Sequence, residues 1–117
     1  MKKLLKSFSY AGLGIVHAFK QRNFKIQLAI AVVVMISGAY FRITETEWCI
    51  ILLCTGLVLS LEMMNSAIEH LVDLVSPDYN KTAGIAKDIA AGSVLFFSII
   101  SAIIGAIIFS KYFINLF

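Results

Sequence analysis

Apolar residues fill three long stretches of the chain, and charged or polar residues separate them. The first stretch covers residues 24–42, the second covers 48–75, and the third covers 87–110. Within the third, 21 residues from Ile89 to Phe109 carry no charge. A helix of that length crosses a hydrocarbon core of roughly 30 Å at about 1.5 Å per residue. The pattern therefore predicts three transmembrane helices.

The polar segments have patterns of their own. In residues 1–23, apolar side chains recur at helical spacing against lysines, which predicts an amphipathic helix lying in the membrane surface. The sequence Ser-Pro-Asp-Tyr-Asn at 76–80 is the strongest turn signal in the chain, and Pro77 is expected to end the second spanning helix. We assign 76–86 to a cytoplasmic turn.

The composition agrees with a membrane protein and excludes several soluble classes. The chain has 117 residues, of which 60% are hydrophobic and 15% are charged. A soluble domain of this size buries too little surface to hide so many apolar side chains. Small soluble enzymes, nucleic-acid-binding modules and disordered tails are therefore excluded. We treat residues 1–117 as a single all-α integral membrane domain.

The distribution of basic residues predicts the orientation in the membrane. Six of the ten Lys and Arg residues lie in 1–25 and two in 66–88, whereas Arg42 and Lys111 stand alone on the opposite side. The positive-inside rule places the N-terminus and 66–88 in the cytoplasm and the C-terminus outside. The chain has a net charge of +3, and its basic side chains are thus expected to contact the headgroups of the cell membrane and not nucleic acid.

A polar stripe interrupts the second apolar stretch. At about 100° per residue, Glu62, Asn65, Glu69 and Asp73 fall on one face of a helix. A carboxylate inside the membrane costs about 2.5–3.5 kcal/mol unless it is paired or protonated. Glu62 alone is equally well explained by a side chain that reaches the interface, and Asn65 by helix–helix packing. Four polar groups on one face favour a functional site, in which two carboxylates about 10 Å apart serve two reagents.

A second candidate is the pair Lys87-Asp88, which opens the third spanning helix. A lysine beside a helix N-terminus is suited to phosphate. Taken by itself, the pair is better explained as a helix cap with a basic membrane anchor. No Gly-x-x-x-x-Gly-Lys-Ser/Thr motif is present, so any use of ATP is not of the P-loop kind.

These two motifs together resemble a known family. Residues 62–73 read EMMNSAIEHLVD, and residues 86–92 read AKDIAAG after the Pro-Asp-Tyr turn. The combination resembles the signature of the prokaryotic diacylglycerol kinase family, which includes the undecaprenol kinases. The resemblance runs from about Lys3 to Phe109.

The resemblance implies a membrane lipid kinase that forms a homotrimer with active sites shared between neighbouring chains. It implies transfer of the γ-phosphoryl group of ATP, with Mg²⁺, to the hydroxyl of diacylglycerol to give phosphatidic acid. The alternative within the family is undecaprenol, which would give undecaprenyl phosphate.

The resemblance also implies roles for individual residues. Glu62 matches the general base, and Asn65 and Asp73 match polar residues that line the site. Glu69 matches a metal-binding carboxylate. Gln21 stands where many members carry a second metal-binding Glu, so we expect a weaker metal shell, because an amide oxygen carries no charge. The residues matched to the ATP site are Gln21, Glu69, Asp78, Tyr79, Asn80, Lys87 and Asp88.

Two other classes of protein are alternatives to a kinase. A small multidrug-type membrane transporter has a similar length, but it should have four spans and a carboxylate in the first. A non-enzymatic pore-forming or helper protein would need neither the polar stripe of 62–73 nor Lys87-Asp88. The kinase is therefore the preferred prediction.

Overall fold

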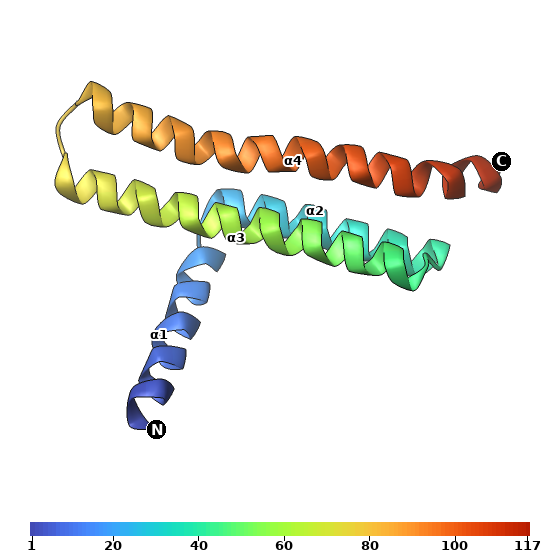
Figure 1. Cartoon of the computed structure of the whole chain (residues 1–117), viewed down its shortest axis with the longest axis horizontal. Coiled ribbons are helices and arrows are strands. Elements are labelled where there is room, and N and C mark those ends of the chain that lie inside the picture. Colours follow the sequence, from blue (N-terminus) through green and yellow to red (C-terminus); the bar gives the residue numbers. More distant parts are fainter.

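The chain is entirely helical. The computed structural model describes residues 1–117 and contains α1 (Lys2–Phe19), α2 (Arg22–Phe41), α3 (Glu45–Val75) and α4 (Lys81–Leu116) (Figure 1). Helices α2, α3 and α4 are each long and apolar enough to cross a membrane. The prediction of an all-α chain with three apolar helices of spanning length is confirmed.

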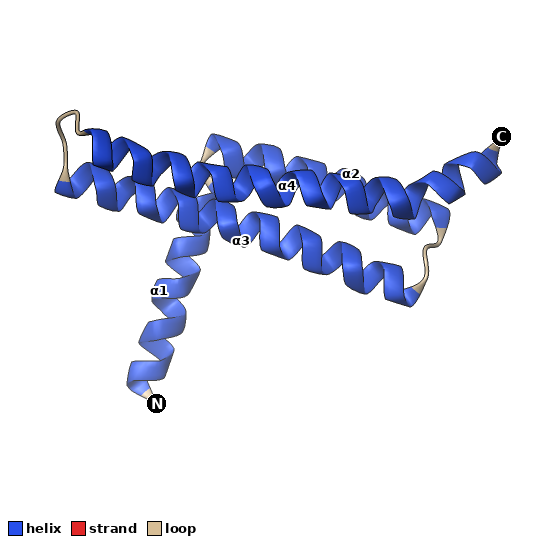
Figure 2. Cartoon of the chain, turned by 45° about the horizontal axis from the view of Figure 1, so that its top comes forward, coloured by secondary structure: helices blue, strands red, loops and turns tan.

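Helix α3 is the centre of the arrangement. It runs antiparallel to α4 along most of its length and also packs against α2 (Figures 1 and 2). Helices α2 and α4 meet where the Phe41 ring packs against the rings of Phe109, Tyr112 and Phe113. Helix α1 projects from this three-helix bundle at a steep angle. Only 14 of the 117 residues are buried within the chain. Most of its apolar surface must therefore be covered by lipid or by other protein.

The turn between α3 and α4 is shorter than the sequence predicted. Helix α3 ends at Val75, two residues before Pro77, as expected for a residue type that disfavours the helical conformation in the residue preceding it. The side chain of Asn80 accepts a hydrogen bond from the backbone N–H of Ala83 at 3.1 Å. This N-cap starts α4 at Lys81, so the expected turn of 76–86 includes the first turn of α4.

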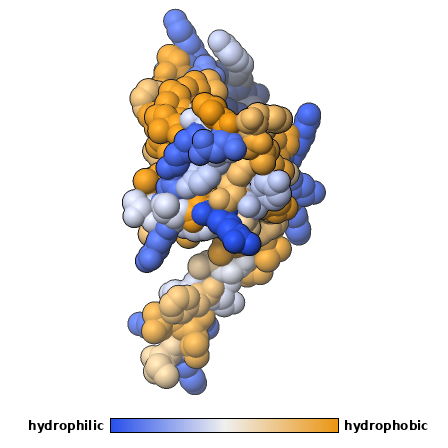
Figure 3. Space-filling model, turned by 90° about the vertical axis from the view of Figure 1, so that its right-hand side faces the viewer, coloured by the Kyte–Doolittle hydropathy of each residue, from blue (hydrophilic) through white to orange (hydrophobic).

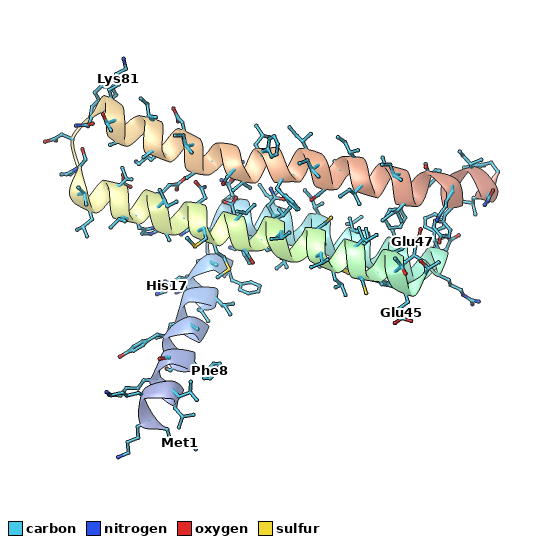
Figure 4. All side chains as sticks on the ribbon, in the orientation of Figure 1. Met1, Phe8, His17, Glu45, Glu47 and Lys81 are labelled. Atoms are coloured by element: carbon cyan, nitrogen blue, oxygen red, sulfur yellow. The ribbon has the colours of Figure 1, made fainter.

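The opposite end of the bundle carries the turn between α2 and α3. Thr44 and Glu47 form a capping box, in which the Thr44 hydroxyl accepts from the Glu47 N–H at 3.2 Å and the Glu47 carboxylate accepts from the Thr44 N–H at 3.0 Å. The same carboxylate accepts a hydrogen bond from the Tyr112 hydroxyl and pairs with the Lys111 ammonium. Glu47 thus connects the start of α3 to the end of α4 through a hydrogen bond and an ion pair (Figure 4). Viewed from this end, hydrophilic side chains interrupt an otherwise largely hydrophobic surface (Figure 3).

Helices α2 and α3 also approach each other closely at this end of the bundle, at Gly38. A Cβ atom at Gly38 would lie 2.9 Å from the ring of Trp48 and 3.1 Å from Ile43 Cδ1. Because only glycine leaves that space, the Trp48 ring can lie against the α2 backbone. The contact holds the two helices together next to their connecting turn.

Candidate functional site

The polar stripe of α3 lines a small cavity nearer the α3–α4 turn than the α2–α3 turn. Glu62 and Asn65 are 4% and 5% exposed, although both side chains are polar. They line a cavity of about 240 Å³ together with residues from the start of α2 and from α4. The other lining residues are Asn23, Ile26, Gln27, Ala91, Val94, Leu95 and Ser98. All three long helices therefore contribute to one polar cavity.

Asn65 connects the cavity to the next carboxylate along the stripe. Its amide Nδ2 donates a hydrogen bond to Glu69 Oε1 at 3.2 Å, across one turn of α3. Its carbonyl Oδ1 is buried and has no hydrogen-bond partner within the chain. Buried polar atoms in folded proteins are almost always paired, so this acceptor is available for a ligand in the cavity.

The two candidate motifs meet at the surface. The Lys87 ammonium of α4 pairs with the Asp73 carboxylate of α3. Both side chains are substantially exposed, so the pair contributes at most about 1 kcal/mol to stability. The pair places a cation at the end of the acidic stripe that lies toward the α3–α4 turn.

The structure does not bring every residue of the predicted ATP site to the cavity. Asp78 and Tyr79 lie in the α3–α4 turn, and Tyr79 is 94% exposed. The Asn80 side chain is engaged in capping α4. Asp88 is exposed on α4, and Gln21 is the N-cap residue of α2, although its side chain makes no capping hydrogen bond. None of these five residues lines the cavity at Glu62, and neither do Glu69, Asp73 and Lys87.

The structure adds three polar residues to which sequence analysis gave no role. Asn23 and Gln27 line the cavity from α2, one turn apart, and Ser98 lines it from α4. Their only signal in the sequence is a polar side chain within or beside an apolar stretch. The packing of the helices decides which of these side chains lie near Glu62. The periodicity of a single helix cannot predict this packing.

The oxygen donors suit a hard cation only in combination with another ligand. No three His, Cys, Asp or Glu side chains are grouped so that they could hold a metal ion by themselves. Glu69 is the carboxylate donor next to the cavity, and it accepts a hydrogen bond from Asn65 Nδ2. Mg²⁺ in phosphate-transfer sites is held by one or two carboxylates plus substrate phosphates. The donors therefore fit Mg²⁺ that arrives with a nucleotide.

Together these features define a helical membrane protein with a buried carboxylate near an exposed pair of charged side chains. Residues 9–109 match the family described as prokaryotic diacylglycerol kinase, and the chain belongs to this family. The predicted enzyme class, a lipid kinase that transfers phosphate to an alcohol group, is confirmed by this membership. The transporter alternative receives no support.

Individual relatives extend the comparison. The chain is 44% identical to the undecaprenol kinase of Bacillus subtilis (strain 168) over 110 residues, which cover 93% of this chain and 89% of that protein. It is 40% identical to a diacylglycerol kinase of Synechocystis sp. over 104 residues, covering 87% of this chain and 59% of that protein. It is 27% identical to the diacylglycerol kinase of Escherichia coli (strain K12) over 96 residues, covering 82% of this chain and 75% of that protein.

Proposed function

We propose that the chain phosphorylates the hydroxyl of a membrane lipid with ATP and that Glu62 is the proton acceptor. The observation that carries this proposal is the burial of Glu62 and Asn65 in one cavity that α2, α3 and α4 line together. Membrane packing alone does not require a carboxylate and an amide there, and an ionisable group at such a depth is costly unless it has a function.

The reaction needs little from the protein beyond placement and one proton transfer. Glu62 takes the proton of the lipid hydroxyl as the hydroxyl oxygen bonds to the γ-phosphorus, and the bond from that phosphorus to the bridging oxygen of ADP breaks. Asn65 Oδ1, which is buried and free, accepts a hydrogen bond from the hydroxyl before transfer and so keeps the lipid oxygen beside Glu62.

The nucleotide approaches from the water-facing side of the stripe. Glu69 is the proposed carboxylate for Mg²⁺, with Gln21 as a weaker neutral ligand, and the ion would neutralise charge on the phosphates. Lys87 would leave Asp73 and pair with a phosphate oxygen. Around it we place the remaining residues of the ATP site, which are Asp78, Tyr79, Asn80 and Asp88, while Asp73 is a polar residue that lines the site.

The orientation follows from where ATP is found. We propose that the N-terminus, the α3–α4 turn and the active site face the cytoplasm and that the C-terminus lies outside, in agreement with the positive-inside rule. The steep angle between α1 and the bundle, together with exposed apolar side chains such as Leu5 and Phe8, supports an amphipathic α1 lying in the membrane surface (Figure 4). The resemblance further implies a homotrimer, which would cover part of the exposed apolar surface.

The lipid is proposed to be diacylglycerol, as the family description suggests. Undecaprenol is the second candidate, because the relative with 44% identity over most of both chains is an undecaprenol kinase. Both lipids present one hydroxyl on an apolar body, so the same cavity can serve either.

The test is a phosphorylation assay with labelled ATP and each lipid in detergent micelles. We expect label in at least one lipid phosphate and loss of that label in Glu62→Gln. A purified, folded wild-type protein that labels neither lipid would overturn the proposed function.

A further inference from the structure

A second and larger cavity lies next to the Glu62 cavity, toward the middle of the bundle. It has a volume of about 450 Å³ and lies over α3 in the space between α2 and α4. Gln27 and Ser98 line both cavities, so the two lie next to each other. Most of its lining is apolar, from Leu59 and Ile51 of α3 to Phe109 of α4. A lipid whose hydroxyl reaches Glu62 would therefore lay an apolar chain along this groove.

Two hydroxyl groups in this groove have no partner. The Oγ atoms of Ser98 and Ser101 are buried and make no hydrogen bond, and the two residues lie one turn apart on α4. Other serines of α4 behave differently, since Ser93 Oγ donates to the Ala90 carbonyl at 2.7 Å and Ser110 Oγ donates to the Ile107 carbonyl at 3.2 Å. Serine hydroxyls in helices commonly donate a hydrogen bond to a backbone carbonyl of the preceding turn in this way. Ser98 and Ser101 are thus two buried donors that a ligand can satisfy.

The ligand that fits these donors carries an acceptor close to its reactive hydroxyl. In diacylglycerol, ester carbonyl oxygens lie a few bonds from the hydroxyl, whereas a polyprenol has only hydrocarbon there. Ser98 lines the same small cavity as Glu62, whereas Ser101 lines only the larger apolar groove. A hydroxyl at Glu62 therefore places the ester groups of a glycerolipid at the two serines.

We propose that Ser98 and Ser101 are specificity-determining residues, whose hydroxyls donate to the ester carbonyls of a glycerolipid bound in the groove. This inference rests on the proposed lipid kinase activity and on Glu62 as the site of transfer. A neutral hydrogen bond of this kind changes kcat/KM by about two- to tenfold, and leaving a buried donor unpaired has a larger effect. The serines should therefore favour lipids with ester groups over lipids of the same shape without them.

The experiment compares three lipids in micelles: 1,2-dioleoylglycerol, its ether analogue 1,2-dioleylglycerol, and a short polyprenol. The ether analogue keeps the glycerol and the hydroxyl but lacks the carbonyls. We expect the wild-type protein to prefer the ester over the ether by about three- to tenfold in kcat/KM. Ser98→Ala and Ser101→Ala should each reduce that preference, mainly through KM for the ester, and the double variant should bring it close to one.

Ser110→Ala is the matched control, because that hydroxyl is already bonded within α4. It should keep the wild-type preference and the wild-type rate with polyprenol, whereas Ser98→Ala and Ser101→Ala should lower kcat/KM for the ester more than for polyprenol. Comparing two lipids on one protein sample also makes the ratio independent of the amount of folded protein.

The contrary outcomes are distinct from failure of the proposed function. Equal use of ester and ether by the wild type, phosphorylation of polyprenol alone, or equal loss for all three lipids in the variants would each overturn the specificity role while lipid kinase activity stands. An equal loss would follow if a helix of a neighbouring chain filled the groove. Absence of phosphate transfer to every lipid by the wild-type protein would instead overturn the proposed function.

Discussion

The Asn65 side chain donates a hydrogen bond to Glu69 at 3.2 Å and leaves its own carbonyl oxygen buried and unpaired one turn away from Glu62. One amide thus touches the carboxylate proposed to meet the metal and faces the cavity of the carboxylate proposed to meet the lipid. Two reagents that arrive from different phases can be aligned by this single side chain. The geometry explains why the stripe contains an amide between two acids.

Replacing Lys87 tests the proposed contact with phosphate. We expect Lys87→Met to raise KM for ATP and to lower kcat, because the lost positive charge would face phosphate in both the ground state and the transition state. Initial rates measured against ATP at saturating lipid give both constants. The exposed pair with Asp73 is weak, so the variant should stay folded.

Lys81→Met is the control for Lys87, since Lys81 is an exposed lysine at the first residue of α4 (Figure 4). It should leave both constants for ATP near the wild-type values. Unchanged ATP kinetics in Lys87→Met would reduce Lys87 to a basic anchor for the membrane.

Gln21→Glu tests the proposed metal shell. A negative charge beside a hard divalent cation should lower the Mg²⁺ concentration that gives half-maximal activity. The measurement is a Mg²⁺ titration of the initial rate at fixed ATP in micelles, with wild type and variant side by side. A midpoint that stays in place or rises would mean that Gln21 does not contact the metal.

Gly38→Ala tests the packing of α2 on α3. A new Cβ would lie 2.9 Å from the Trp48 ring, so the ring or the helix must shift, at a cost of about 1–3 kcal/mol in the free energy of unfolding. Thermal or denaturant unfolding in detergent should therefore show a less stable protein. Gly56→Ala is the control, because a Cβ there meets no atom within 4 Å, and it should be neutral or stabilising. Equal stability of the two variants would contradict the close contact at Gly38.

Much of the fold and part of the site could be predicted from the sequence, for physical reasons. Apolar length fixes the helices that can cross a bilayer, and helical periodicity places Glu62, Asn65 and Glu69 on one face. Neither property says which residues of other helices approach that face. Asn23 and Ser98 reach the cavity only through packing, so a polar side chain within or beside an apolar stretch is their only signal in the sequence.

The turn between α3 and α4 shows the same limit. Asp73 and Lys87 belong to two motifs that are separated in the sequence, at 62–73 and 86–92. The short turn capped by Asn80 brings the two side chains together. The start of α4 at Lys81 depends on that cap, whereas the sequence prediction relied on the first apolar residues further along. Local hydrogen bonding therefore decided the boundary, and hydrophobicity did not.

The most direct test of the account is the rate of phosphoryl transfer by Glu62→Gln. The substitution keeps the size of the side chain and removes only the proton acceptor. General-base catalysis contributes about 10²–10⁴-fold, so we expect kcat to fall by at least about a hundredfold while thermal stability and ATP binding remain at wild-type levels. Glu45→Gln, at the exposed start of α3, should retain full activity. Retention of more than about a tenth of the wild-type kcat by Glu62→Gln would contradict a general-base role for this buried carboxylate.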